Sequence, residues 1–393
     1  MSGAKGRGRS AVKGKDEAGG GKKRPPARNT AVKKAAPQPP SRAATPARAV
    51  APAAQDAPAV PHPQIGLDEL MRRLADPEVP DAELIPYLSA RRDPAFGLGP
   101  MLLPNDATVS MDGDPAVAQA RARGNLGLGF LNHIYRSRRR RIFEDRLVAG
   151  DKRPVLLAEG DSWFQYPVFL QDVVDHLLPD FNVLCLSAAG DELRSMVKEG
   201  EYRDYLLRLA SEVPFRAMLI SGGGNDVVGE QMRLLLCDYD PARDAAGHLD
   251  TARWGQKIAD ILAGYESMIA AVHEVMPGLP ILMHGYDYAR PLPAQDFHVP
   301  PLDGWVGEPM RARGIPDGPL QVEIVRLMID GINKALERLA GGNVAGGKHS
   351  RVFLVDNRGV VAGRWHDELH PLDAGFAAVT AKFRDVLRQA GVA

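Results

Sequence analysis

The sequence predicts an α/β protein: a three-layer α/β/α sandwich with a five-stranded parallel sheet, spanning residues 151–393. Five short apolar runs occur in that part of the chain, and stretches with the apolar spacing of helices separate them. Strands that alternate with helices are joined by right-handed crossovers, which make the strands parallel and cover both faces of the sheet. The expected strands are Val155–Leu157, Val183–Leu186, Ala217–Ser221, Ile281–His284 and Val352–Val355.

Helices are expected between these strands and after the last one, over residues 168–178, 192–211, 255–275, 320–339 and 372–389. Two long insertions interrupt the alternation, roughly Glu230–Arg253 and Tyr286–Pro319, and Asp and Pro recur in both. Long loops in a compact domain often bind ligands or act as lids. We therefore expect the two insertions to shape the choice of substrate.

Two further segments precede the α/β domain. Residues 1–64 carry 13 Lys and Arg against 3 Asp and Glu and contain no Phe, Trp or Tyr. Such a segment buries too little apolar surface to offset its ordering entropy, so we expect it to be disordered. Residues 65–150 are predicted to be a small helical region of unknown role. Its helix candidates cover residues 67–74, 81–88 and 117–143.

Charge is distributed unevenly along the chain. The formal net charge is zero, but residues 1–64 carry +10, which leaves 36 basic and 46 acidic residues, or −10, for the remainder. The basic tail favours contact with a polyanion, although a solvated extension without a partner is the simpler interpretation. For the basic run Arg136–Arg141, the expected role is a solvated helix face that pairs with Glu144 and Asp145, and an anion-binding patch is the alternative.

Composition also excludes several classes of protein. Cys185 and Cys237 form neither a disulfide framework nor a metal-binding spacing, and Cys185 is expected to be a buried free thiol. No apolar run reaches the roughly 18 residues of a membrane span, and the N-terminus lacks the apolar segment of a secretory signal. A cytoplasmic location is expected, with an organelle transit peptide as the alternative. No GxGxxG motif follows a predicted strand and no P-loop lysine occurs, so nucleotide binding is not expected. No cofactor is expected either.

Polar blocks follow four of the five predicted strands. Ser162 follows the first strand in Gly-Asp-Ser-Trp, Gly190 follows the second, and Asn225 follows the third in Gly-Gly-Gly-Asn-Asp. Asp367 and His370 lie between the fifth strand and the last helix. Because the carboxyl ends of parallel strands share one edge of the sheet, these residues are expected to meet there.

These residue types fit acyl transfer. A serine hydroxyl such as that of Ser162 is a poor nucleophile until a base takes its proton. His370 is the candidate base, and Asp367, three residues earlier, is placed to orient its imidazole. The backbone N–H groups of Ser162 and Gly190, with the amide of Asn225, are candidate donors for an oxyanion hole.

Each block alone has a simpler explanation. Gly-Asp-Ser is often a helix N-cap, Gly-Gly-Gly-Asn-Asp is often a turn, and Asp-x-x-His-Pro fits the start of a helix. The occurrence of all the blocks in one order, each after a predicted strand, favours a hydrolase.

In this order the blocks resemble those of the SGNH hydrolases, also called the GDSL esterase/lipase family, over roughly residues 151–393. The resemblance implies a flavodoxin-like sandwich and ester hydrolysis without a metal. It assigns the family's namesake roles to Ser162, Gly190, Asn225 and His370, with Asp367 as the acid of the triad. The residue after the serine is Trp163 instead of the usual leucine, which is expected to change the pocket wall and not the chemistry.

Other residues near the same edge are candidates for contact with substrate. Trp163, His284 and Trp365 are named as substrate-binding candidates, while a structural role is an equal alternative for His284. Further aromatic candidates for the pocket, with core packing as the alternative, are Phe164, Tyr166 and Trp305. His366 is expected to be only a neighbour of the triad.

The sequence therefore predicts a serine hydrolase that cleaves carboxylic esters of a small molecule, lipid or sugar through an acyl-enzyme. Two alternatives remain. An acyltransferase would use the same site, with an alcohol in place of water. A catalytically inactive binding module would be tethered by its basic tail.

Overall fold

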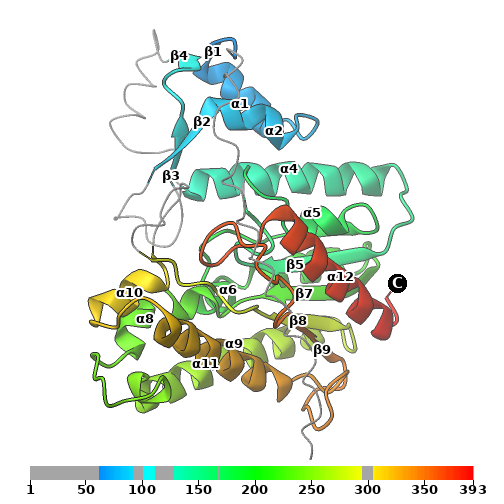
Figure 1. Ribbon diagram of the computed structural model, residues 1–393. Helices are drawn as coiled ribbons and strands as arrows, with labels where there is room; N and C mark the ends of the chain where they lie inside the picture. The colour runs from blue at the N-terminus through cyan, green and yellow to red at the C-terminus, as the bar shows by residue number, and fades with distance from the viewer. Residues whose placement is uncertain (1–61, 92–100, 111–127, 167, 294–303, 393) are drawn as a thin grey trace, which may run out of the picture. The chain divides into compact units, whose positions relative to one another are not determined.

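Five parallel strands form the centre of the computed structural model, in the order β6-β5-β7-β8-β9 (Figure 1). The structure describes residues 62–91, 101–110, 128–166, 168–293 and 304–392, all of which belong to one compact unit, Val60–Ala393. The strands are β5 (Val155–Gly160), β6 (Asn182–Cys185), β7 (Phe215–Ser221), β8 (Ile281–Gly285) and β9 (Val352–Asp356). Each overlaps one of the five predicted strands.

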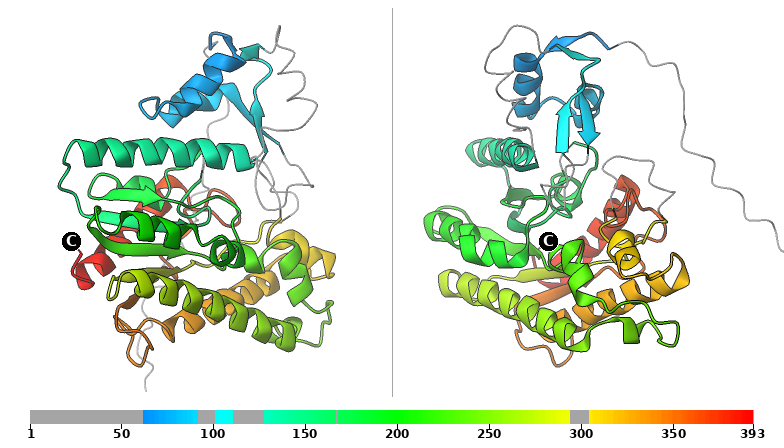
Figure 2. Two further views of the ribbon diagram at one scale, coloured as in Figure 1. Left: turned by 180° about the vertical axis from the view of Figure 1, so that it is seen from behind. Right: turned by 90° about the vertical axis from the view of Figure 1, so that its left-hand side faces the viewer.

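Helices cover both faces of this sheet (Figures 1 and 2). One face is covered by α4 (Leu128–Val148), α5 (Val173–Leu177) and α12 (Asp373–Gln389). The other is covered by α6 (Leu193–Glu199), α7 (Glu201–Leu209), α9 (Thr251–Val275) and α11 (Pro319–Glu337). The predicted three-layer α/β/α sandwich with a five-stranded parallel sheet is confirmed.

Two helices differ from their predicted ranges for local reasons. The helix expected at 168–178 begins only at Val173, because the carboxylate of Asp172 accepts the N–H groups of Val174 and Asp175 and caps the helix there. The helix expected at 192–211 is divided into α6 and α7 by Gly200. Its left-handed conformation, with φ of 63°, ends a helix readily in glycine.

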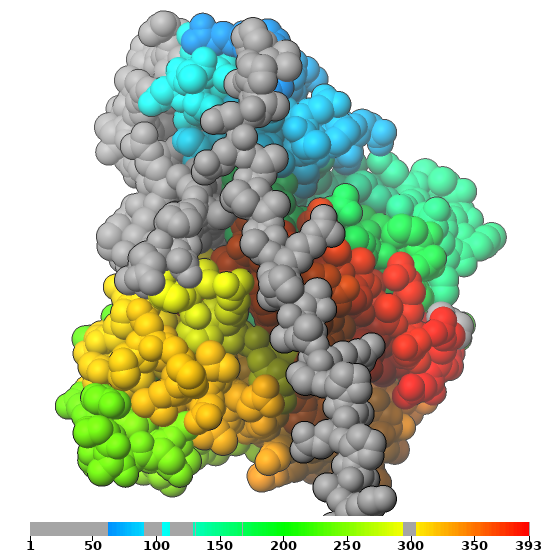
Figure 3. All heavy atoms as spheres, in the orientation of Figure 1, coloured from blue at the N-terminus to red at the C-terminus, as the bar shows by residue number. Residues whose placement is uncertain are grey.

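The two insertions carry short helices of their own. The first contains α8 (Glu230–Leu235) and a 3-10 turn, Ala246–His248, and the second contains α10 (Gly307–Ala312). Helices α8 and α10 lie side by side at the surface (Figure 3). The guanidinium of Arg313, just after α10, donates to the carbonyl of Arg233 and to Asp238. The described parts of both insertions are therefore part of the folded domain.

The region before α4 is not only helical. It contains α1 (Leu67–Ala75), α2 (Asp81–Leu84) and a 3-10 turn, Ile85–Tyr87, which holds Pro86. Its described residues also form four short strands that were not predicted from the sequence. They are β1 (Ile65–Gly66), β2 (Leu88–Arg91), β3 (Met101–Pro104) and β4 (Val109–Ser110). β2 pairs with β3 and β1 with β4. Residues 1–61 of the predicted tail lie outside the described residues, and so do residues 117–127 of the predicted long helix.

Helix α4 has two buried faces. Leu131, Ile134 and Tyr135 pack with the apolar side chains of the region before α4. On another side, Asn132 and Arg139 contact the loops that follow β6 and β5. Helix α4, which lies before the boundary predicted at residue 150, therefore packs both on the sheet and on the region that precedes it.

The arginine run near the middle of α4 is only partly a solvated face. Arg140 is exposed and pairs with Glu144 at 2.7 Å, as expected. Arg138 and Arg139 are buried, against expectation. The reason for Arg139 is that its guanidinium lies between two carboxylates, those of Asp172 at 2.7 Å and Asp175 at 2.8 Å.

Candidate active site

The turn after β5 carries Ser162. The carbonyl of Asp161 accepts the N–H groups of Phe164 and Gln165, which makes a tight turn directly beyond the strand. Gly160, the last residue of β5, lets the ends of β5 and β7 approach closely, because a Cβ there would lie 2.6 Å from the Cβ of Ser221. Ser162 thus lies at the carboxyl edge of the sheet, as the sequence predicted.

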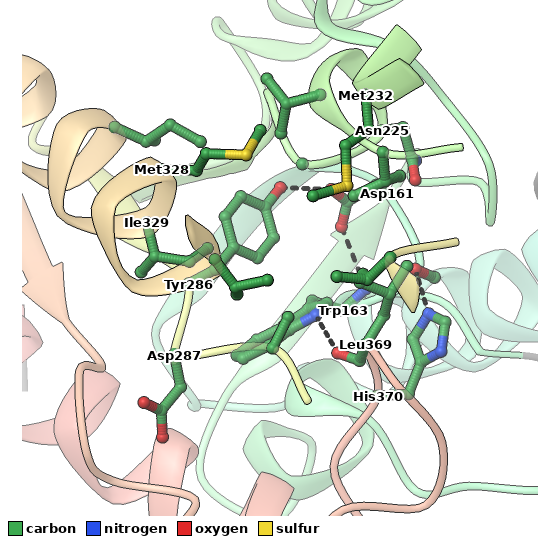
Figure 4. Close-up of a pocket in the computed structure, with 18 residues that line it drawn as sticks. Asp161, Trp163, Asn225, Met232, Tyr286, Asp287, Met328, Ile329, Leu369 and His370 are labelled. Carbon is green, nitrogen blue, oxygen red and sulfur yellow. Dashed lines mark hydrogen bonds between the residues drawn. The ribbon is translucent and has the colours of Figure 1, made fainter. Parts of the chain in front are cut away.

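Three side chains that are distant in sequence form a continuous hydrogen-bonded chain at this edge. Ser162 Oγ lies 2.7 Å from His370 Nε2, and His370 Nδ1 lies 2.8 Å from Oδ2 of Asp367 (Figure 4 shows His370). All three side chains are buried. In this arrangement Nε2 can take a proton from Oγ while Asp367 holds the other ring nitrogen.

Asp367 is kept ionised by its surroundings. Burial alone would raise the pKa of its carboxyl group, but the adjacent His370 and the N–H groups of Leu369 and His370 outweigh this, so the pKa is lowered. The rings of Tyr166 and Trp305 pack edge-on against His370, with centroid distances of 4.7 and 5.6 Å. The imidazole is therefore held on several sides.

The candidate oxyanion donors lie on neighbouring loops. Asn225 begins the 3-10 turn Asn225–Val227, and its Nδ2 donates to the carbonyl of Asp191 at 2.8 Å. Because an amide nitrogen carries two hydrogens, this bond orients the group and uses only one of them. Gly190 has a φ of 89°, a left-handed conformation that favours glycine.

A buried polar network lies beneath the serine. The carboxylate of Asp161 accepts the N–H of Trp163 at 3.0 Å, the hydroxyl of Ser221 at 2.7 Å and the hydroxyl of Tyr286. His284 Nε2 lies 2.6 Å from the same Ser221 oxygen. Burial lowers the pKa of His284 to about 4, so its imidazole is neutral at physiological pH.

The predicted substrate contacts occupy three different positions. Trp163 lines a pocket beside Ser162, and its indole N–H donates to the carbonyl of Leu369 (Figure 4). His284 is fully buried in the network under the serine and does not line the pocket. Trp365 is partly buried against the core and does not line the pocket either.

The pocket beside Ser162 is small, with a cavity volume of about 50 Å³. It is bounded by the loops that follow β5, β7 and β8, by both insertions and by α11. Met232 of the first insertion and Val306 of the second line the pocket, so each insertion contributes to its wall.

Sequence reasoning missed the contribution of α11. Val325, Met328, Ile329 and Ile332 line the pocket, at the i, i+3, i+4 and i+7 spacing of one helix face. This spacing was the available signal. It is the same spacing that a helix shows when its face packs only against a core, so it does not by itself identify a pocket.

Glu368 was also missed, although it lies inside the Asp-x-x-His block. Its buried carboxylate accepts the N–H groups of Leu292, Val306 and Gly307, each at 2.9 Å. Burial raises the pKa of Glu368, and the three N–H groups partly offset that rise. The side chain thus joins the second insertion to the loop that carries Asp367 and His370.

Two features are absent from the described residues. None of their helices is long and apolar enough to cross a membrane. Within the same ranges, no group of three or more His, Cys, Asp or Glu side chains is arranged to hold a metal ion. Cys185 and Cys237 are both free, and Cys185 is buried, as predicted.

No family model and no curated protein matches the chain. Among solved structures it is similar to a lipase from a goat rumen metagenome, with 16% identity and a TM-score of 0.39, over 61% of this chain and 98% of that one. It is also similar to an extracellular lipase from Streptomyces rimosus, with 13% identity and a TM-score of 0.38, over 59% and 99%. A third is a salicylyl-acyltransferase from a tetracycline biosynthetic pathway, with 15% identity and a TM-score of 0.34, over 62% and 56%.

Proposed function

We propose that this protein is a serine hydrolase that cleaves carboxylic esters through an acyl-enzyme. One observation carries the proposal: the unbroken hydrogen-bonded chain from Ser162 through His370 to Asp367 opens onto a pocket at the carboxyl edge of the sheet. Ser162 and His370 are 208 residues apart in sequence. Such an alignment of nucleophile, base and acid is what acyl transfer to serine requires.

In the first half of the reaction, Ser162 Oγ bonds to the ester carbonyl carbon as its proton passes to Nε2 of His370. The negative charge that develops on the carbonyl oxygen is stabilised by hydrogen bonds donated by the N–H groups of Ser162 and Gly190 and by the amide of Asn225. His370 then gives the proton to the alkoxide as the carbon–oxygen bond to the alcohol breaks. The acyl group stays on Ser162 and the alcohol leaves.

The second half regenerates the enzyme. A water molecule gives its proton to Nε2 of His370 and bonds to the acyl carbon, and the proton then returns to Ser162 Oγ as the acid departs. Asp367 stays ionised and stabilises the imidazolium in both halves. An acyltransferase differs only in that an alcohol replaces the water. Product analysis with an added acceptor alcohol distinguishes the two reactions.

Labelling with a fluorophosphonate probe tests the proposal, because such probes react with activated serines. We expect the wild type to be labelled on the peptide that contains Ser162 and Ser162→Ala to remain unlabelled. A matched control is Ser267→Ala, which changes an exposed serine of α9, and we expect it to label like the wild type. A folded wild type that neither labels nor cleaves any ester would contradict the proposal and favour a binding module.

A further inference from the structure

The pocket beside Ser162 is bounded mainly by aliphatic and thioether side chains. Helix α11 presents Val325, Met328, Ile329 and Ile332 along one face, and all four are buried. Further apolar wall comes from Met232 of α8 and Val306 of the second insertion. The area in contact with a ligand is therefore overwhelmingly apolar, with the reacting serine at one end.

The carboxylates that border the pocket already accept hydrogen bonds from other groups of the protein. The oxygens of Asp161 accept the hydroxyl groups of Ser221 and Tyr286 and the N–H of Trp163. Asp287 points away from the methionine side chains in Figure 4, and its oxygens accept backbone N–H groups that include those of Gly359 and Val361. A polar group placed among the α11 side chains would lose its water without gaining these oxygens as partners, which is costly.

The position of the base indicates which half of the ester enters. Figure 4 shows Met328 and Ile329 across the site from His370, with Trp163 between them. The leaving alcohol must lie next to His370 Nε2 to receive its proton. The group that remains on Ser162 is therefore the one directed toward α11.

We infer that the pocket binds the acyl chain of the ester and selects aliphatic acyl groups over acetyl and over polar acyl groups. This inference rests on the proposed function. Met232 and Met328 suit the role, because the flexible, polarisable methionine side chain adapts to chains of different shape. Specificity of this kind is set by α11 and the two insertions, which lie outside the blocks that carry the chemistry.

A series of p-nitrophenyl esters, from acetate to dodecanoate, measures the selection. For the wild type we expect kcat/KM to rise by about fourfold for each added methylene until the pocket is full. The variant Met328→Trp fills the pocket, and we expect it to lower the butanoate-to-acetate ratio of kcat/KM by about tenfold or more. Met328→Ala enlarges the pocket and is expected to move the optimum toward longer chains.

Leu327→Trp is the matched control, because Leu327 is the adjacent residue of α11 and is 39% exposed. We expect its chain-length profile to equal that of the wild type. Circular dichroism of each variant shows whether it is folded. Should Met328→Trp not fold, Met328→Ala still tests the inference by the direction in which the optimum moves.

Several outcomes would overturn the inference. The inference is wrong if the chain-length profile of the wild type is flat, or if the Met328 variants keep the wild-type profile. In either case, labelling of Ser162 by the fluorophosphonate probe would still support the proposed function. A loss confined to esters with long alcohols, measured with ethyl and hexyl acetate, would assign the pocket to the alcohol. A wild type that is neither labelled nor active on any ester would overturn the inference together with the function.

Discussion

The side-chain amide of Asn132 is hydrogen-bonded to both backbone groups of Ala189. Its Nδ2 donates to the carbonyl and its Oδ1 accepts the N–H, each at 3.0 Å. The same oxygen, 3.3 Å away, also accepts from the amide of Gln165. Ala189 precedes Gly190 and Gln165 follows Ser162 by three residues, so Asn132 joins the two segments that carry the proposed backbone oxyanion donors.

Removal of this link should impair turnover more than binding. We expect Asn132→Ala to lower kcat by about ten- to a hundredfold with KM changed by no more than about twofold, because displaced oxyanion donors act mainly in the transition state. Steady-state kinetics on one ester measure both constants. The exposed Ser137→Ala on the same helix is the control. A rise in KM with kcat unchanged would show that Asn132 does not position the catalytic groups.

Asp367→Asn should leave the fold intact and reduce turnover. The amide no longer stabilises the imidazolium of His370 and favours the wrong ring tautomer, so we expect kcat at neutral pH to fall by about 10³- to 10⁴-fold. The control is Asp385→Asn, an exposed carboxylate of α12 that pairs with Arg388. A loss of less than about tenfold would mean that Asp367 does not act on the histidine as proposed.

The arginines of α4 provide a comparison within one helix. Arg139 is buried between Asp172 and Asp175, so Arg139→Met leaves the buried Asp172 and the half-buried Asp175 without their cationic partner and should cost about 3–5 kcal/mol of the free energy of unfolding. Arg140 is exposed with Glu144, and Arg140→Met should cost no more than about 1 kcal/mol. Denaturant titrations measure both values.

Adding Asp172→Asn to Arg139→Met should restore part of the lost stability, because it removes one of the stranded charges. Equal costs for Arg139→Met and Arg140→Met, or no recovery in the double variant, would mean that Arg139 does not stabilise the loop after Ser162 through its charge.

His284 should make the protein less stable in acid. The unfolded chain binds a proton on this histidine below about pH 6.5, whereas the pKa in the folded state is lowered to about 4 by burial. The unfolded state therefore holds more protons between these values. The free energy of unfolding should fall as the pH falls from 6.5 to 4, by up to about 3 kcal/mol from this residue.

The comparison with His284→Gln isolates this contribution from those of other titrating groups. Denaturant titrations between pH 4 and 8 should show a weaker loss of stability in acid for His284→Gln than for the wild type. The exposed His133→Gln of α4 is the control and should keep the wild-type slope. Parallel curves for wild type and His284→Gln would show that His284 is not held neutral by the fold.

Much of the fold and of the candidate site was predictable from local patterns. The strands were predicted because each is a short apolar run followed by turn-forming residues, a pattern that is typical of a buried strand. Ser162, Asn225 and His370 were found because they follow such runs in one order. Since parallel strands end at one edge, order along the chain already implied proximity in space.

The features that could not be predicted have sequence patterns that are compatible with more than one structure. Arg139 and Arg140 are neighbours of the same type, yet one is buried between carboxylates and the other is exposed, because a helix turns by about 100° between them. Asn132 carries no motif, and its partners Ala189 and Gln165 lie 57 and 33 residues away on two different loops. His284 is likewise buried by residues distant in sequence, since its imidazole packs against Phe164 and Trp163 of the turn after β5 and against Phe383 of α12.

The sequence by itself determined the class of fold and the residues of the proposed triad, because both depend on residue type and on order along strands and helices. Only the tertiary structure decided which apolar faces enclose a pocket and which polar side chains support it. The stripe of Val325, Met328, Ile329 and Ile332 would be the same in a helix packed entirely into a core. It borders a pocket because the two insertions, and not another layer of core, lie opposite α11.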